Sequence, residues 1–143
     1  MSPTVCLNMI VKNEAGVIRR CLESVKPLIH HWVIVDTGST DGTQAIIREH
    51  FSEVPGELHE RAWKNFGHNR SEALVFARGK SDYILVIDAD EEIVVSPGFV
   101  MPSGADAYMV RYGFAGSPVT WHRATFVKAS LPWRYQGVLH EYL

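Results

Sequence analysis

The chain has 143 residues, of which 46% are hydrophobic and 21% charged, and its formal net charge is −2. A length of about 100–200 residues is usual for one domain, so we expect a single domain over residues 1–143. The nearly balanced charge excludes a general attraction to nucleic acid. Two cysteines exclude a disulfide framework, and no apolar run approaches the about 18 residues of a membrane-spanning helix. We therefore expect a cytoplasmic protein without a membrane span, for which any contact with a membrane would be peripheral.

Strand and helix patterns alternate along the first two thirds of the chain. In chain order we expect a strand at residues 4–11, a helix that Asn13 caps at its start, a strand at 32–35, a helix around 45–47, a weak strand at 58–62, a helix at 69–78 and a strand at 83–87. The strand segments are apolar runs, and the helical segments carry apolar residues on one face. This order predicts parallel strands with right-handed helical crossovers, as in an α/β sandwich.

The pattern changes after Glu92. Prolines and glycines predict a loop up to residue 104, and residues 107–112 and 119–128 are typical of antiparallel strands. Acidic residues are scarce in this part, since only Glu141 follows Asp106. The region would suit either an anionic ligand or a solvated β-meander.

Polar residues stand where three predicted strands end, at residues 13–14, 36–42 and 88–92. Ligands of open α/β sheets bind beyond the carboxyl ends of the strands. We therefore expect a single binding site at this edge of the sheet.

The acidic segment Asp88-Ala89-Asp90-Glu91-Glu92 follows a buried strand directly. Carboxylates two residues apart can reach the same side of a loop, and such hard oxygen ligands suit Mg²⁺ or Mn²⁺ together with phosphate oxygens. The alternative is a solvated acidic loop.

The segment from Asp36 to Thr43 (DTGSTDGT) ends another strand. Its hydroxyl and carboxylate side chains can cap the next helix, whose N-terminus favours an anion, or they form only a capped turn. Asp36 itself would be partly buried and would need a hydrogen-bond donor as partner, which the edge of a nucleotide base could supply.

Arg70 lies in the segment KNFGHNRSE at residues 64–72. Its guanidinium could stack on a base or bind a phosphate. The alternative is a surface loop in which Asn69 or Ser71 caps a helix.

Five segments in this order resemble the family 2 glycosyltransferases of the GT-A fold: CLNMIVKNEAGVIRRCLESV, VIVDTGSTDGT, FGHNRSEAL, YILVIDADEE and WRYQGVLHE. The bacterial branch with lipopolysaccharide-core and other cell-surface enzymes is the most similar. The resemblance implies a Rossmann-like three-layer α/β/α sandwich with a mostly parallel central sheet and a C-terminal antiparallel β portion. Residues 1–92 would be the donor-binding half, and residues 93–143 a β-rich acceptor-side portion that we expect to be truncated.

The resemblance also implies a nucleotide-diphospho-sugar donor, usually a UDP-sugar, and Mn²⁺ or Mg²⁺ as cofactor. Asp90 would bind the metal that bridges the diphosphate, and Asp88 would reach the ribose or a metal-bound water. The remaining donor-site residues that it implies are Val11, Asn13, Glu14, Asp36, Gly38, Ser39, Arg70 and Ala89.

Family members of this kind invert the anomeric centre, which requires a general base to take the proton of the acceptor hydroxyl. After Glu92 only Asp106 and Glu141 are acids, and the resemblance favours Glu141, with His140 as a second metal or diphosphate contact. The alternative for Glu141 is an ordinary terminal residue. The chain departs from the family where Thr37 replaces the second aspartate of an Asp-Asp-Gly-Ser loop.

The expected function is therefore metal-dependent transfer of a sugar, with inversion, to a glycan, lipid or protein acceptor. The alternative is a nucleotide-sugar-binding module or fragment without transferase activity. A nucleotidyltransferase is disfavoured because residues 11–14 do not form the glycine-rich basic loop that such an enzyme needs after its first strand.

Overall fold

The computed structural model describes residues 2–137 and 143. One six-stranded sheet runs through it in the order β3-β2-β1-β4-β6-β5. The strands are β1 (Val5–Val11), β2 (His31–Asp36), β3 (Gly56–Glu60), β4 (Tyr83–Val86), β5 (Ala107–Gly113) and β6 (Thr120–Lys128). The helices are α1 (Ile18–Val25), α2 (Thr43–His50) and α3 (Phe66–Ala77).

The first four strands are parallel, and the last two continue the same sheet as an antiparallel hairpin. In the register of the parallel part, Asp36 lies opposite Val11 of β1 and Glu60 of β3. The carboxyl ends of β1, β2 and β3 therefore lie side by side. The expected mostly parallel sheet with a C-terminal antiparallel portion is confirmed.

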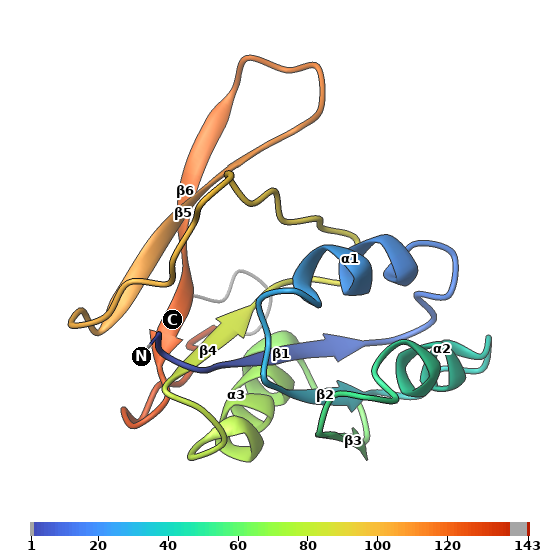
Figure 1. The fold of residues 1–143 in the computed structure, drawn as a ribbon. Coiled ribbons are helices and arrows are strands. Elements are labelled where there is room, and N and C mark those ends of the chain that lie inside the picture. The colour runs from blue at the N-terminus through green and yellow to red at the C-terminus, as the bar shows by residue number, and fades with distance from the viewer. Residues whose placement is uncertain (1, 138–142) are drawn as a thin grey trace.

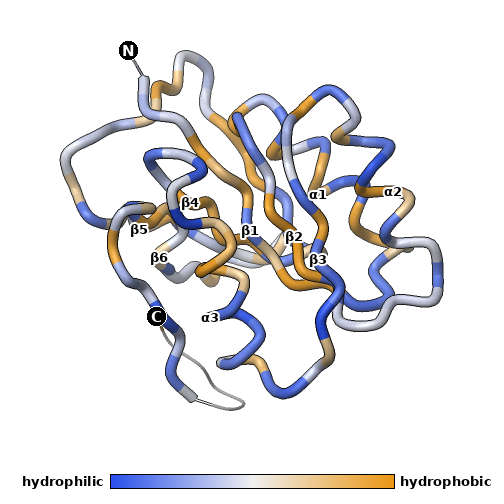
Figure 2. The backbone as a smooth tube through the Cα atoms, turned by 90° about the horizontal axis from the view of Figure 1, so that it is seen from below, coloured by the Kyte–Doolittle hydropathy of each residue, from blue (hydrophilic) through white to orange (hydrophobic). Residues whose placement is uncertain are grey.

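Helices cover both faces of the parallel part (Figure 1). Leu7 and Met9 of β1 pack with residues of α1 and α2, whereas Cys6 packs with residues of α3 such as Leu74. This alternation follows from the period of two in a strand, which turns successive side chains to opposite faces. Figure 2 shows the hydrophobic residues concentrated in the central strands. The three-layer sandwich is thus confirmed.

The hairpin of β5 and β6 projects away from the helices (Figure 1). Its base is held in the core by Phe126 and Val127, which are 5% and 0% exposed. Toward its tip, large apolar side chains such as Phe114 and Val119 are exposed. Among the residues described, no helix has the length and apolar character needed to cross a bilayer.

Two helix starts differ from expectation. Asn13 does not cap α1, which begins at Ile18; Asn13 has a φ of 53°, and its side chain accepts a hydrogen bond from Thr40 N. A distant contact thus replaces the local cap. The third helix begins earlier than expected, because Asn65 caps it by accepting from His68 N. Asn69, proposed as a cap, lies fully buried within that helix.

Candidate functional site

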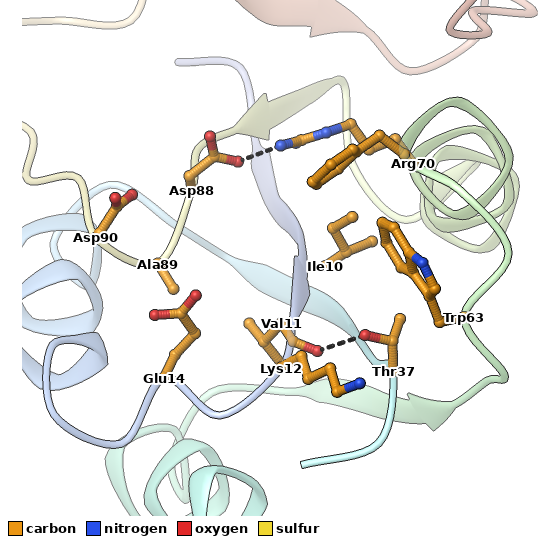
Figure 3. Close-up of a pocket in the computed structure, with 11 residues that line it drawn as sticks. Ile10, Val11, Lys12, Glu14, Thr37, Trp63, Arg70, Asp88, Ala89 and Asp90 are labelled. Carbon is orange, nitrogen blue, oxygen red and sulfur yellow. Dashed lines mark hydrogen bonds and ion pairs between the residues drawn. The ribbon is translucent and has the colours of Figure 1, made fainter. Parts of the chain in front are cut away.

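A pocket of about 400 Å³ opens at the carboxyl ends of β1, β2 and β4, beside the start of α3 (Figure 3). Pockets of this size commonly bind small ligands. Its walls combine acidic, basic and aromatic side chains from segments far apart in the sequence. The lining residues are Ile10, Val11, Lys12, Glu14, Thr37, Trp63, Phe66, Arg70, Asp88, Ala89 and Asp90. The expected site at this edge of the sheet is therefore present as a cavity.

Three carboxylates gather on one side of the pocket, those of Glu14, Asp88 and Asp90, with Trp63 and Arg70 on the other (Figure 3). Burial raises the pKa of Glu14, and the negative charges of Asp90, Asp88 and Asp41 raise it further. The mutual repulsion means that a cation would be favourable here.

The three carboxylates form an acidic wall that could bind a divalent metal ion. Within the described part of the chain, no three His, Cys, Asp or Glu side chains are arranged to hold a metal by themselves. Mg²⁺ commonly uses one or two carboxylates together with phosphate oxygens and water. Asp88 and Asp90 suit that mode of binding, in which the ligand itself completes the metal site.

Arg70 and Asp88 form an ion pair across the pocket, with 2.8 Å between Nη2 and Oδ1. The two side chains are 14% and 34% exposed, so solvent screens the pair only in part. The guanidinium also lies 5.9 Å from the centre of the Phe66 ring. Arg70 thus fixes Asp88 and forms part of the pocket wall between α3 and β4.

Asp36 is 1% exposed, which confirms that it is buried at the end of its strand. Its Oδ1 accepts hydrogen bonds from Gly38 N at 2.9 Å and Ser39 N at 2.8 Å. Gly38 has a φ of 114°, a conformation that glycine adopts without steric cost. Asp36 Oδ2 is buried and has no hydrogen-bond partner among the residues described. One oxygen of this carboxylate therefore lacks a donor, which is costly in a protein interior.

The loop after Asp36 is tied to the end of β1. Ser39 Oγ accepts from Asn13 N at 2.8 Å, and both the amide and the hydroxyl of Thr37 donate to Val11 O, at 2.9 and 3.1 Å. Asn13, Asp36, Gly38 and Ser39 are not among the lining residues themselves, but are chain neighbours of the lining residues Lys12, Glu14 and Thr37 or follow directly after them. Thr37, which replaces the second aspartate of the Asp-Asp-Gly-Ser loop, thus has a structural role, because its hydroxyl joins the ends of β1 and β2.

Sequence reasoning missed five lining residues, of which Trp63 is the most informative. Its side chain is 44% exposed and meets Phe66 edge-on, with 4.9 Å between ring centres. A tryptophan between a predicted strand and a predicted helix was the available signal, because that loop lies at the ligand-binding edge of the sheet. The other four are Ile10, Lys12, Thr37 and Phe66.

The structure does not bring Asp106 to the pocket. Asp106 is exposed and lies 3.8 Å from the ammonium of Lys128, which pairs with Tyr83 at the first residue of β4. The pocket lies beyond the other end of that strand. His140 and Glu141, the remaining candidates of the C-terminal segment, lie outside the described residues.

The sequence profile described as Glycosyl transferase family 2 matches residues 6–97. The prophage-derived glycosyltransferase SunS of Bacillus subtilis is 38% identical over 90 residues, which are 62% of this chain and 20% of that protein. Beta-monoglucosyldiacylglycerol synthase of Synechocystis is 30% identical over 148 aligned positions, covering 94% of this chain and 31% of that protein. The chain therefore spans a fifth to a third of the length of these relatives.

Among solved structures, a mannosyltransferase from Pyrobaculum calidifontis in complex with GDP-Man and Mn²⁺ superposes with a TM-score of 0.54 at 25% identity. The match covers 63% of this chain and 28% of that one. The likeness confirms the expected GT-A arrangement of the sheet and its helices.

Proposed function

Because the chain belongs to glycosyl transferase family 2, we propose that its pocket binds the nucleotide diphosphate of a sugar donor, a UDP-sugar, for transfer to an acceptor. One observation carries the proposal. The pocket has a three-carboxylate wall at one side, and the buried carboxylate of Asp36, next to the lining residue Thr37, has one oxygen without a hydrogen-bond partner among the described residues. A nucleotide diphosphate with its metal presents complementary chemistry at its two ends.

At the base end, Asp36 Oδ2 would accept the N–H of a uracil ring. The oxygen has no donor in the described part of the protein, and its neighbour Thr37 lines the pocket. Trp63 would offer an aromatic face for stacking, an interaction worth about 1–3 kcal/mol per base. Glu14, Val11 and the loop around Gly38 would surround the ribose.

At the diphosphate end, Asp90 and Asp88 would hold Mn²⁺ or Mg²⁺. A bound cation would offset the negative charge that develops on the diphosphate when it leaves the sugar. Arg70 would keep Asp88 oriented toward the ribose or a metal-bound water through their 2.8 Å hydrogen bond. The cation would favour the ionised form of the neighbouring Glu14, against the burial and the charge repulsion that raise its pKa.

The reaction of the whole protein would invert the anomeric centre, with Glu141 as the general base and His140 as a further metal or diphosphate contact. Asp106 is the weaker candidate for the base because it lies just before β5, beyond the opposite end of β4. The acceptor would be a glycan, a lipid or a protein, bound on the side of residues 93–143.

A second candidate function is nucleotide-sugar binding without transfer. One observation favours it: Asp106, one of the two acids expected as the general base, is remote from the pocket. Incubation with a UDP-sugar and an acceptor library separates the two functions, because sugar transfer by this chain excludes the binding-only alternative.

Donor binding is tested by a thermal-shift panel of UDP-, GDP- and dTDP-sugars with and without Mn²⁺, followed by calorimetry with UDP. We expect UDP compounds to bind with Mn²⁺ present, and Asp90→Ala to remove the contribution of Mn²⁺. Asp106→Ala is the matched control and should bind like the wild type. If UDP does not bind with Mn²⁺, or if Asp90→Ala binds it unchanged, the proposed site is wrong.

A further inference from the structure

Arg123 of β6 reaches from the projecting hairpin to the acidic loop after β4. Its Nη1 and Nη2 donate to the two carboxylate oxygens of Glu91 at 3.1 and 2.7 Å. The side chains of Arg123 and Glu91 are 39% and 24% exposed. Their bidentate geometry makes the pair stronger and more specific in orientation than an ordinary surface ion pair.

Glu91 uses the same carboxylate to close the loop that carries the metal-ligand candidates. Asp88 N donates to Glu91 Oε2 at 2.9 Å, and Glu91 N donates to Asp88 O at 3.0 Å. Both carboxylate oxygens of Glu91 are therefore engaged. Glu91 acts on the backbone beside Asp88, while Asp88 and Asp90 line the pocket.

Arg123 is also held by Tyr112 of β5, within the same hairpin. Arg123 Nη2 also donates to Tyr112 Oη at 3.0 Å, and its guanidinium lies 4.2 Å from the centre of the Tyr112 ring. Tyr112 Oη lies 2.8 Å from the hydroxyl of Thr125, which is 1% exposed. A chain of contacts thus runs from the buried base of β6 to the amide of Asp88.

β4 ends at Val86, so residues 88–91 form a loop beyond the strand. Resting on the proposed function, we propose that Glu91 and Arg123 are positioning residues that hold the Asp88–Asp90 loop in its metal-binding shape. Through these two residues, the hairpin of β5 and β6 sets the geometry of the loop that would bind the donor. Losing the outer hydrogen-bond partner of a metal ligand commonly lowers metal affinity about 10- to 100-fold.

The test compares Arg123→Gln, Arg123→Lys and Glu91→Gln with Glu92→Gln as the matched control. Glu92 is in the same loop, but its partner is the exposed Arg20 at 3.1 Å. The readouts are amide exchange of Asp88 in the ligand-free chain, affinity for UDP with Mn²⁺, and affinity for uridine, which has no diphosphate to engage the metal.

We expect Arg123→Gln to speed exchange of the Asp88 amide and to weaken UDP–Mn²⁺ binding about tenfold or more. Arg123→Lys should weaken UDP–Mn²⁺ binding less than Arg123→Gln does, because lysine keeps the charge but not the bidentate geometry. Uridine affinity should stay within about twofold, as is usual for a distant site. The control Glu92→Gln should change none of these readouts.

The proposal is overturned if Arg123→Gln and Glu92→Gln behave alike, or if uridine and UDP–Mn²⁺ lose affinity equally in both Arg123 variants. If the wild type binds neither ligand, the proposed function has failed, and amide exchange decides the positioning role alone. Faster exchange of Asp88 in Arg123→Gln than in the control then supports the role, and equal exchange overturns it.

Discussion

Replacement of Asp36 by asparagine should separate ligand binding from folding stability. In the wild type, Oδ1 of this buried side chain accepts from Gly38 N and Ser39 N, whereas Oδ2 has no partner in the described part of the chain. Asp36→Asn can keep the first oxygen in place. It puts an amide donor where the second oxygen stood, and there it would face the N–H of a uracil ring.

The expected magnitudes follow from these contacts. A hydrogen bond to a charged acceptor contributes about 1.5–3 kcal/mol, so its loss should weaken uridine binding roughly 10- to 150-fold. Stability has two opposing contributions. Asp36→Asn removes a buried charge of which only one oxygen is hydrogen-bonded within the described part of the chain. The neutral oxygen of the asparagine, however, accepts more weakly from the amides of Gly38 and Ser39. We therefore expect the free energy of unfolding to change by no more than about 1 kcal/mol.

Calorimetry with uridine and urea unfolding measure the two quantities. Asp82→Asn is the matched control, because the Asp82 carboxylate accepts from Thr4 N and Thr4 Oγ1 at the opposite end of β4. The control should leave uridine binding unchanged. Wild-type affinity in Asp36→Asn would exclude a bond from Oδ2 to the base, and a large loss of stability would show that the Asp36 charge stabilises the fold.

Three further predictions concern two carboxylates of the pocket and the start of α3. Because the raised pKa of Glu14 disfavours its ionised form in the folded chain, stability is lost as pH rises past the ordinary glutamate range; Glu14→Gln should be more stable than the wild type near pH 7 and indistinguishable near pH 4 in thermal unfolding. Arg70→Met and Asp88→Asn should show a coupling of about 1–2 kcal/mol in a double-mutant cycle of urea unfolding, between the values for exposed and buried pairs; additive losses would contradict the ion pair. Asn65→Ala should cost about 1 kcal/mol of unfolding free energy as a lost helix cap, and an unchanged urea midpoint would contradict that role.

The parallel sheet and the edge that carries the site were predictable from local sequence patterns. The apolar run ending at Asp36 predicts both a covered strand and a carboxylate held at its end, and the structure has both. The apolar run before Asp88 likewise predicts that the Asp88–Asp90 segment lies at this edge, where both aspartates line the pocket. These features depend on strand periodicity and on the rule that parallel strands present their carboxyl ends together.

Features set by distant contacts were not predictable in this way. The expected helix cap at Asn13 failed because Ser39 and Thr40, 26 and 27 residues away, engage its backbone and side chain. The bond from Arg123 to Glu91 joins residues 32 apart and depends on how the hairpin packs beside β4. Trp63 was missed because its loop has no periodic pattern.

The claim that the pocket holds a nucleotide diphosphate with a divalent cation is tested most directly by NMR with UDP, replacing Mg²⁺ by Mn²⁺. Paramagnetic Mn²⁺ broadens the signals of nearby nuclei. We expect broadening that requires UDP, centres on Glu14 and the Asp88–Asp90 loop, spares α2 and the hairpin tip, and disappears in Asp90→Ala. Broadening that is independent of UDP, or that centres elsewhere on the chain, would show that this pocket does not hold the nucleotide and the cation together.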